Sequence, residues 1–149
     1  MNVNIASIPV SCQLVIPSRD HLYEHVRANA GAATRMAVQN SHTGKRVAIC
    51  GAGVSLVDLC TEIPADMDEV WGCNSALNYL VSRGCRVTHG FAIDAGVETV
   101  TEWQETFAVE YLVASSVDPR LVRHLRAAGR PCRFFHSYLG LDNPPDWTQ

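Results

Sequence analysis

The sequence lacks the features that mark membrane, secreted and nucleic-acid-binding proteins. None of its apolar runs approaches the roughly 20 residues that cross a bilayer, and residues 1–5 carry no basic side chain of the kind that opens a secretory signal. Positive charge is not in excess, because 12 Lys and Arg stand against 15 Asp and Glu for a formal charge of −3. We therefore expect no general attraction to nucleic acid or to an anionic membrane.

Metal and redox motifs are lacking as well. The 6 cysteines include no Cys-x-x-Cys pair, so we expect free thiols that fill the interior of a protein in the reducing cytoplasm. His21 and His25 have helical spacing but no glutamate between them in the His-Glu-x-x-His order, and Cys132 and His136 have no second pair of ligands. The sequence therefore predicts no bound metal.

The composition is that of an ordinary folded domain. Hydrophobic residues make up 47% of the 149 residues and charged residues 18%, which suits one domain with a real hydrophobic core. Residues 1–44 read as a lead-in, with a short β-prone stretch and a helix over 21–39 that Ser18 can cap. We expect this lead-in to pack on a main domain formed by residues 45–149.

From residue 45 onward, strand and helix patterns alternate. Such alternation predicts an α/β fold, a Rossmann-like three-layer sandwich with about five mostly parallel strands and helices on both faces. Strands are expected at 47–50, 69–73, 86–93, 110–114 and 132–135, and helices at 55–63, 75–82, 98–107 and 116–128.

The turn after the first expected strand is the clearest functional signal. Gly51, Gly53 and Ser55 follow an apolar run and precede an amphipathic stretch. Glycines there allow close approach of a ligand, and the helix that comes next turns free N–H groups toward the same place. This order favours a phosphate or nucleotide site. Leu56 stands where a dinucleotide-binding motif has its third glycine.

Polar residues also follow the other expected strands. Parallel sheets bind ligands beyond the carboxyl ends of their strands, near the switch in strand order, so these residues should share one rim. Each has a plain structural alternative: a helix cap for Asn74 and a loop contact for Asp94. His89, inside a strand, is expected to be a hydrogen-bonded structural histidine. The rim residues are Asn74 with Ser75, Asp94, Ser115 with Ser116, and His136.

Two enzyme classes are disfavoured by the residues in and after the turn. A nicotinamide cofactor needs an acidic residue at the end of the second strand to hold the ribose, and Asn74 stands there. Ser55 lacks the second glycine of the Gly-x-Ser-x-Gly motif, which argues against a Ser-His-Asp hydrolase.

Three blocks of this sequence carry a family likeness. Residues 47–56, then Trp71-Gly72-Cys73-Asn74-Ser75-Ala76-Leu77, then Phe91-Ala92-Ile93-Asp94 resemble the Gly-x-Gly-Pro-Ser-Leu, Asn-Ser/Gln and strand-end Asp blocks of a Rossmann-like group. That group includes the hydroxymethylpterin pyrophosphokinase-like domains, a family of unknown function common in bacteriophages. It is distantly similar to the bacterial CMP-sialic-acid sialyltransferases.

The resemblance implies roles for individual residues. Gly51, Gly53 and Ser55 would line the phosphates or ribose, Asn74 with Ser75 would contact the nucleoside, and Asp94 would lie at the rim of the same cleft. Val54 replaces the proline of the first block. The sequence ends before the later half in which the sialyltransferases carry their catalytic histidine and tyrosines, so we expect a shortened relative that keeps the binding half.

These observations lead to one expected function and one alternative. The expected function is binding of CMP or another nucleotide or nucleotide sugar, in a glycosyl- or pyrophosphoryl-transferase-like family, with Asp94 or His136 assisting transfer. The alternative is a phage-encoded structural or interaction protein that uses the fold as a scaffold. Expected partners are the nucleotide ligand and another copy of the chain or virion proteins, in the host cytoplasm or the virion.

Overall fold

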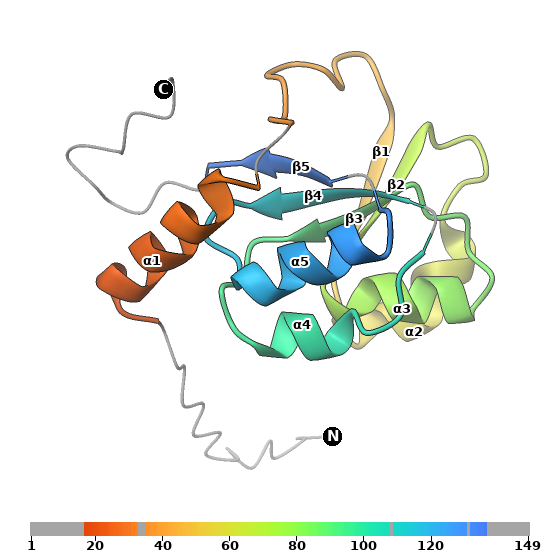
Figure 1. Ribbon diagram of the computed structural model, residues 1–149. Helices are drawn as coiled ribbons and strands as arrows, with labels where there is room; N and C mark the ends of the chain where they lie inside the picture. Colours follow the sequence, from red (N-terminus) through yellow and green to blue (C-terminus); the bar gives the residue numbers. More distant parts are fainter. Residues whose placement is uncertain (1–16, 33–34, 108, 131, 137–149) are drawn as a thin grey trace, which may run out of the picture.

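A five-stranded parallel sheet forms the centre of the protein. The computed structural model describes residues 17–32, 35–107, 109–130 and 132–136 (Figure 1). All neighbouring strands pair in parallel, in the order β1-β2-β3-β4-β5. The α/β class and the Rossmann-like parallel sheet expected from the sequence are therefore confirmed. The strands are β1 (Val47–Cys50), β2 (Glu69–Cys73), β3 (His89–Ala92), β4 (Glu110–Ala114) and β5 (Cys132–Phe135).

The helices follow the expected positions but several are shorter. Ser18 caps α1 by accepting a hydrogen bond from the His21 N–H, yet α1 ends with Gly31 as its carboxyl-terminal cap, well short of residue 39. Asp118 caps α5 and Pro119 is its first residue, so this helix begins after the expected position 116. The helices are α1 (Arg19–Ala30), α2 (Ser55–Leu59) with the 3-10 turn η1 (Cys60–Glu62), α3 (Ser75–Ser82), α4 (Glu98–Glu102) and α5 (Pro119–Ala127).

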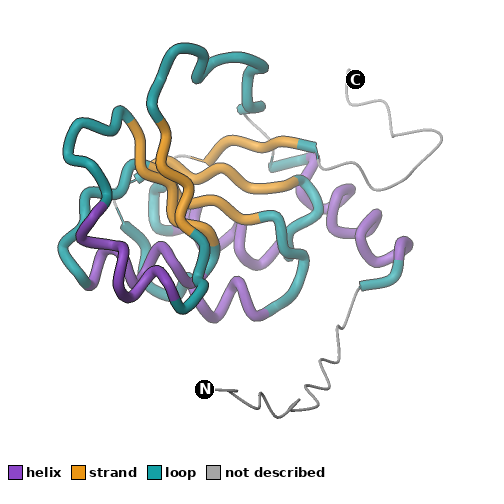
Figure 2. Tube along the Cα trace, turned by 180° about the vertical axis from the view of Figure 1, so that it is seen from behind, coloured by secondary structure: helices purple, strands orange, loops and turns teal. Residues whose placement is uncertain are grey.

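The strand order places α2, α3, α4 and α5 on the same face of the sheet. Each right-handed crossover moves one strand further in the same direction, so each connecting helix is laid down on the same side. Figures 1 and 2 show these four helices below the sheet, and α1 beside one end of it. The expectation of helices on both faces, with a switch in strand order, is wrong for the described residues, because consecutive strands are neighbours throughout.

The core lies between the sheet and these helices. Trp103 and Tyr111 are fully buried and their rings meet edge to face at 5.2 Å. Leu77 from α3 and Leu121 with Leu125 from α5 complete the main cluster. A smaller cluster around Cys60, Val70 and Leu80 lies under β1 and β2. The core therefore consists of two hydrophobic clusters, side by side along the sheet.

Two glycines let α3 approach the sheet closely. A Cβ added at Gly72 would stand 2.6 Å from the Leu77 Cα, and one at Gly90 would stand 2.9 Å from the Tyr111 ring. Both distances are shorter than real side chains allow, so β2 and β3 need glycine where α3 crosses them.

Replacing Gly72 with alanine tests this packing. The added methyl group meets backbone, which cannot rotate away, so Gly72→Ala should lower the free energy of unfolding by about 1–3 kcal/mol. Gly31→Ala is the matched control, because its Cβ meets nothing within 4 Å. Urea unfolding followed by circular dichroism measures both; equal stability of the two variants would contradict the close approach.

Candidate functional site

The residues expected at the carboxyl-end rim do share one edge, but they form a row. Adjacent strands lie about 4.8 Å apart, so the turn after β1 and His136 after β5 stand about 19 Å apart across four strand intervals. Gly51–Ser55 and His136 therefore cannot surround one small ligand, whereas Asn74 and Asp94 fall between them, after β2 and β3. Only an elongated molecule could contact both ends.

The turn after β1 is open to solvent. Gly51, Gly53 and Ser55 are all exposed. Neither glycine has a positive φ, and a Cβ at Gly51 would meet nothing within 4 Å while one at Gly53 would meet only the Ser55 hydroxyl at 3.9 Å. Neither the backbone conformation nor the packing of the described residues requires glycine here, which leaves room for a group that approaches from outside.

The helix after this turn is weaker than the sequence suggests. The sequence predicts a single helix over 55–63 with an apolar stripe, but α2 has only five residues and none of them is buried. Leu59 is 49% exposed, and Cys60 in η1 is the first residue of the stripe to be fully buried.

Asn74 is the most unusual residue of the rim. Its φ of 48° and ψ of −126° lie in a region that non-glycine residues avoid. The core imposes this conformation, because the Asn74 N–H donates to Phe91 O at 3.0 Å and its carbonyl accepts from Trp103 Nε1 at 2.9 Å. Its side chain makes no cap hydrogen bond to α3, and its Oδ1 is buried with no partner among the described residues. Ser75, half-buried, follows as the first residue of α3.

Asp94 lies in an acidic part of the rim. Its Oδ1 accepts the Gly96 N–H at 2.9 Å, which is the loop contact that the sequence offered as the alternative to a functional role. Burial raises the pKa of the nearby Glu102, and the charges of Asp94 and Glu98 raise it further. Negative charge at this point disfavours a phosphate group and suits a ligand that donates hydroxyl hydrogens.

His136 has a partner that sequence reasoning did not identify. Its Nδ1 lies 2.9 Å from the Ser115 Oγ, because β4 and β5 are neighbours and each places a polar residue just past its end. Ser115 is 6% exposed, whereas His136 is exposed. Partial burial of the imidazole lowers the pKa of His136, which favours the neutral form, the one that can accept a proton.

The lead-in helix α1 supports this end of the rim. Asn29 Nδ2 donates to Ser115 O at 3.0 Å and to Val117 O at 2.8 Å. His25 Nδ1 donates to Ser116 O at 3.1 Å. The two side chains are buried, so α1 fixes the backbone of the turn that carries Ser115. The expected β-prone stretch before α1 lies outside the described residues.

A second polar group lies on the sheet face away from α2–α5. The Glu69 carboxylate, 4% exposed as a residue, contacts Lys45, accepts from Trp71 Nε1 at 2.8 Å and pairs with His42 Nδ1 at 2.8 Å. His89 lies 3.8 Å from Glu69 and 3.5 Å from Glu110. His89 Nδ1 also lies 2.9 Å from the Thr88 Oγ1, so His89 is hydrogen-bonded within the sheet, as expected. No motif marks this group, since its members are far apart in the sequence.

The electrostatics of Glu69 follow from those contacts. Burial by itself would raise the pKa of the carboxyl, but the hydrogen bonds from Lys45, Trp71 and His42 and the charge of His89 outweigh it and hold the pKa at about 2. The carboxylate is therefore ionised at any physiological pH, and the group acts as an ion-paired brace across the amino-terminal halves of the strands.

Metal-ligating clusters and membrane spans are both lacking in the described ranges. No group of three or more His, Cys, Asp or Glu side chains is arranged to hold a metal ion there. No helix in the same ranges has the length and apolar character needed to cross a membrane. The cysteines placed by the structure are free: Cys50, Cys60, Cys73, Cys85 and Cys132.

Comparison with known proteins adds no relative. No family model matches the chain, and neither curated proteins nor solved structures give a match. The function must therefore be inferred from the residues and geometry of the chain itself.

The Glu69 group predicts an acid-sensitive contribution to stability. Because the folded pKa of about 2 lies below the ordinary 4.5, the contribution is present above pH 4.5 and is lost as pH falls toward 2. Glu69→Gln should lower the stability at pH 7 by on the order of 2 kcal/mol and flatten the dependence between these pH values. Glu62→Gln, which changes an exposed carboxylate, is the control. Urea unfolding at a series of pH values decides; a variant that keeps the wild-type acid slope would refute this assignment.

Proposed function

We propose that the carboxyl-end rim binds a nucleotide or nucleotide sugar, such as CMP or a CMP-sugar, for a glycosyl- or pyrophosphoryl-transfer reaction. The observation that carries the proposal is Asn74, whose backbone is strained and whose buried Oδ1 has no partner among the described residues. Strain of this kind costs about 1–3 kcal/mol, and an unmade buried hydrogen bond adds about 1–3 kcal/mol. The core accounts for the strained backbone, so the unpaired oxygen is the feature that a bound ligand would explain.

The charge along the rim differs from place to place, and this assigns the charged and uncharged parts of the ligand to different places. The acidic surroundings of Asp94 disfavour a phosphate, whereas the exposed turn at residues 51–55 offers backbone N–H groups and the Ser55 hydroxyl. The phosphate therefore belongs at the turn, and the sugar or base belongs beside Asn74 and Asp94, whose oxygens accept hydrogen bonds from hydroxyl and amino groups. The two places are two strand intervals apart, about 10 Å.

The bond that breaks in such a transfer adjoins the phosphate, so with the phosphate at the turn the reacting group lies nearer Asp94. His136, about 19 Å from the turn, can act only on a distant part of an extended ligand or acceptor. Neutral His136 can take a proton through Nδ1 from the Ser115 hydroxyl, or from an acceptor hydroxyl that displaces it. Ser115 is held by its own N–H, which donates to Phe135 O at 2.8 Å, and by Asn29 from α1. Such fixed geometry is what general base catalysis needs.

Nucleotide binding is tested by titration of the whole chain with CMP, UDP, GDP, ATP and NAD in thermal-shift and calorimetric experiments. Asn74→Gly is the decisive variant, because glycine tolerates the positive φ and has no side-chain amide. It should keep or raise the melting temperature while weakening binding about tenfold or more. Ser55→Ala should weaken binding of the same ligand, and Ser41→Ala, an exposed serine before β1, should not. Unaltered binding by Asn74→Gly, or binding of none of the five compounds, would remove the proposal.

A specific observation also favours the alternative of an interaction protein. β1 is an edge strand, and large apolar side chains are exposed on and beside it: Ile49 is 67% exposed, Val54 92% and Val57 57%. Exposed apolar groups around an unpaired edge are typical of a surface that another chain covers. Light scattering of wild type and Ile49→Lys separates the two functions, since a scaffold loses its assembly in the variant whereas a monomeric enzyme is unchanged.

A further inference from the structure

A cavity of about 340 Å³ lies at the outer edge of β5, away from the carboxyl-end rim. The segment of residues 35–37 runs along β5, with Phe134 N–H donating to Arg35 O at 3.0 Å and Ala37 N–H donating to Phe134 O at 2.7 Å. The end of α5 closes the other side. The size falls at the lower end of the roughly 300–1,000 Å³ of small-molecule sites. Described residues that line it are Ala32, Arg35, Arg126, Gly129, Arg130, Cys132 and Phe134.

Three arginines line this cavity, and no Asp or Glu is among the described residues that line it. Arg130 is held in place, because its Nε donates to Thr106 Oγ1 and its Nη2 to Thr106 O, both at 3.2 Å. Arg35 and Arg126 are exposed and make no ion pair or side-chain hydrogen bond within the described residues. Arginine does not lose its proton in proteins, so the three side chains that line the cavity stay positively charged at any physiological pH.

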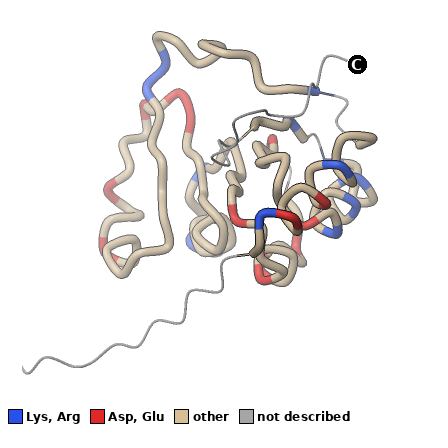
Figure 3. Tube along the Cα trace, turned by 90° about the vertical axis from the view of Figure 1, so that its left-hand side faces the viewer, with Lys and Arg blue, Asp and Glu red and all other residues tan. Residues whose placement is uncertain are grey.

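The end of α5 explains only part of this arrangement. Positive side chains are favourable near the carboxyl end of a helix, which accounts for Arg126 and for Arg130 just beyond it. Arg35 comes from a separate segment, 91 positions before Arg126 in a chain of net charge −3, and the dipole of α5 gives no reason for it to converge there. Figure 3 shows many of the Lys and Arg positions on the right-hand side of the picture, with others at its upper left.

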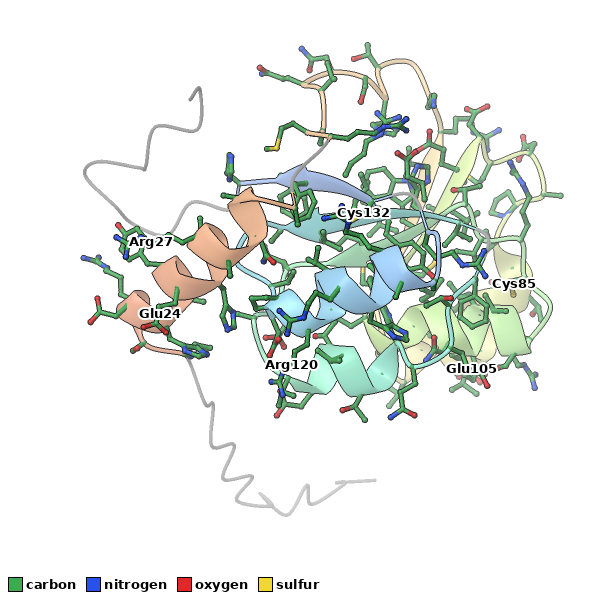
Figure 4. All side chains as sticks on the ribbon, in the orientation of Figure 1. Glu24, Arg27, Cys85, Glu105, Arg120 and Cys132 are labelled. Carbon is green, nitrogen blue, oxygen red and sulfur yellow. The ribbon has the colours of Figure 1, made fainter. Side chains whose placement is uncertain are left out.

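The floor of the cavity is apolar and uncharged. Phe134 is 2% exposed. Cys132, labelled in Figure 4, is the first residue of β5. Burial raises the pKa of its thiol to about 12, so the sulfur carries no negative charge. An apolar floor with a few converging polar groups at the mouth is the usual composition of a site for a small organic ligand.

We propose that the cavity formed by Arg35, Arg126, Arg130 and the apolar floor of Cys132 and Phe134 binds a small organic molecule through its phosphate or diphosphate group. A planar guanidinium group can donate two parallel hydrogen bonds to two oxygens of a phosphate, whereas the ammonium group of lysine acts as a single point charge. The site is separate from the rim that carries Asn74 and His136, and it stands whether or not that rim binds a nucleotide.

The test uses the full chain and inorganic pyrophosphate as the probe, in isothermal titration calorimetry at constant ionic strength. Wild type should bind one equivalent saturably, and Arg35→Ala and Arg126→Ala should each weaken binding about tenfold or more. Arg126→Lys should recover less than half of the lost affinity, because it restores charge without the paired geometry. Arg123→Ala, which removes an exposed arginine of the same helix that does not line the cavity, should bind as wild type does.

The proposal would be overturned by the absence of saturable binding, by equal weakening in Arg123→Ala, or by full rescue in Arg126→Lys. Sedimentation with phosphatidic acid vesicles in the absence of pyrophosphate binding would also overturn it, in favour of a membrane surface. Unchanged far-ultraviolet circular dichroism shows that each variant is folded. Asn74→Gly should bind pyrophosphate as wild type does, which keeps this test independent of the nucleotide titrations.

Discussion

The close approach of α3 to the sheet governs how the chain passes through the rim and how the core is packed. Gly72 and Gly90 leave room for Leu77 and the Tyr111 ring, and the chain must enter α3 through a sharp corner at Asn74. The Asn74 N–H donates to Phe91 O, and the Asn74 carbonyl accepts from Trp103 Nε1, so its backbone is held from either side. The strained conformation of Asn74 is thus imposed by the core, whereas its unpaired side-chain oxygen is not needed by it. The backbone conformation of Asn74 therefore serves the fold, whereas its side-chain oxygen is available for binding.

Consecutive strand order determines the form of the rim. A doubly wound sheet reverses direction at one point and opens a crevice there, but β1 to β5 advance in a single direction. The polar residues at the strand ends therefore form a line, with a glycine turn at one end, the acidic surroundings of Asp94 in the middle and the Ser115–His136 pair at the other. A line of this length suits an extended ligand with distinct charged and uncharged parts.

Local patterns predicted the elements well, and distant contacts explain what they missed. The Ser18 cap and the positions of all five strands follow from spacing and turn chemistry. The placement of helices on one face depends on strand order, which no local pattern encodes. Ser115 and His136 were identified at strand ends, but their contact needed the pairing of β4 with β5. Glu69 and Arg35 were missed because their partners lie in other segments, joined only by the fold.

Binding of a nucleotide beside Asn74 can be followed residue by residue in nitrogen-15 NMR spectra of the chain titrated with CMP. Asn74 has both a backbone and a side-chain amide signal, and we expect both to shift saturably, with neighbouring shifts at Ser55 and Ser75 and along the rim toward Ser115. The amide signals of Arg126 and Arg130 should shift with pyrophosphate, and with CMP only through its phosphate group. The signals of Asn74 should not shift when pyrophosphate is added alone. Unshifted Asn74 signals at saturating CMP, or shifts confined to the arginine cavity, would contradict nucleotide binding at the rim.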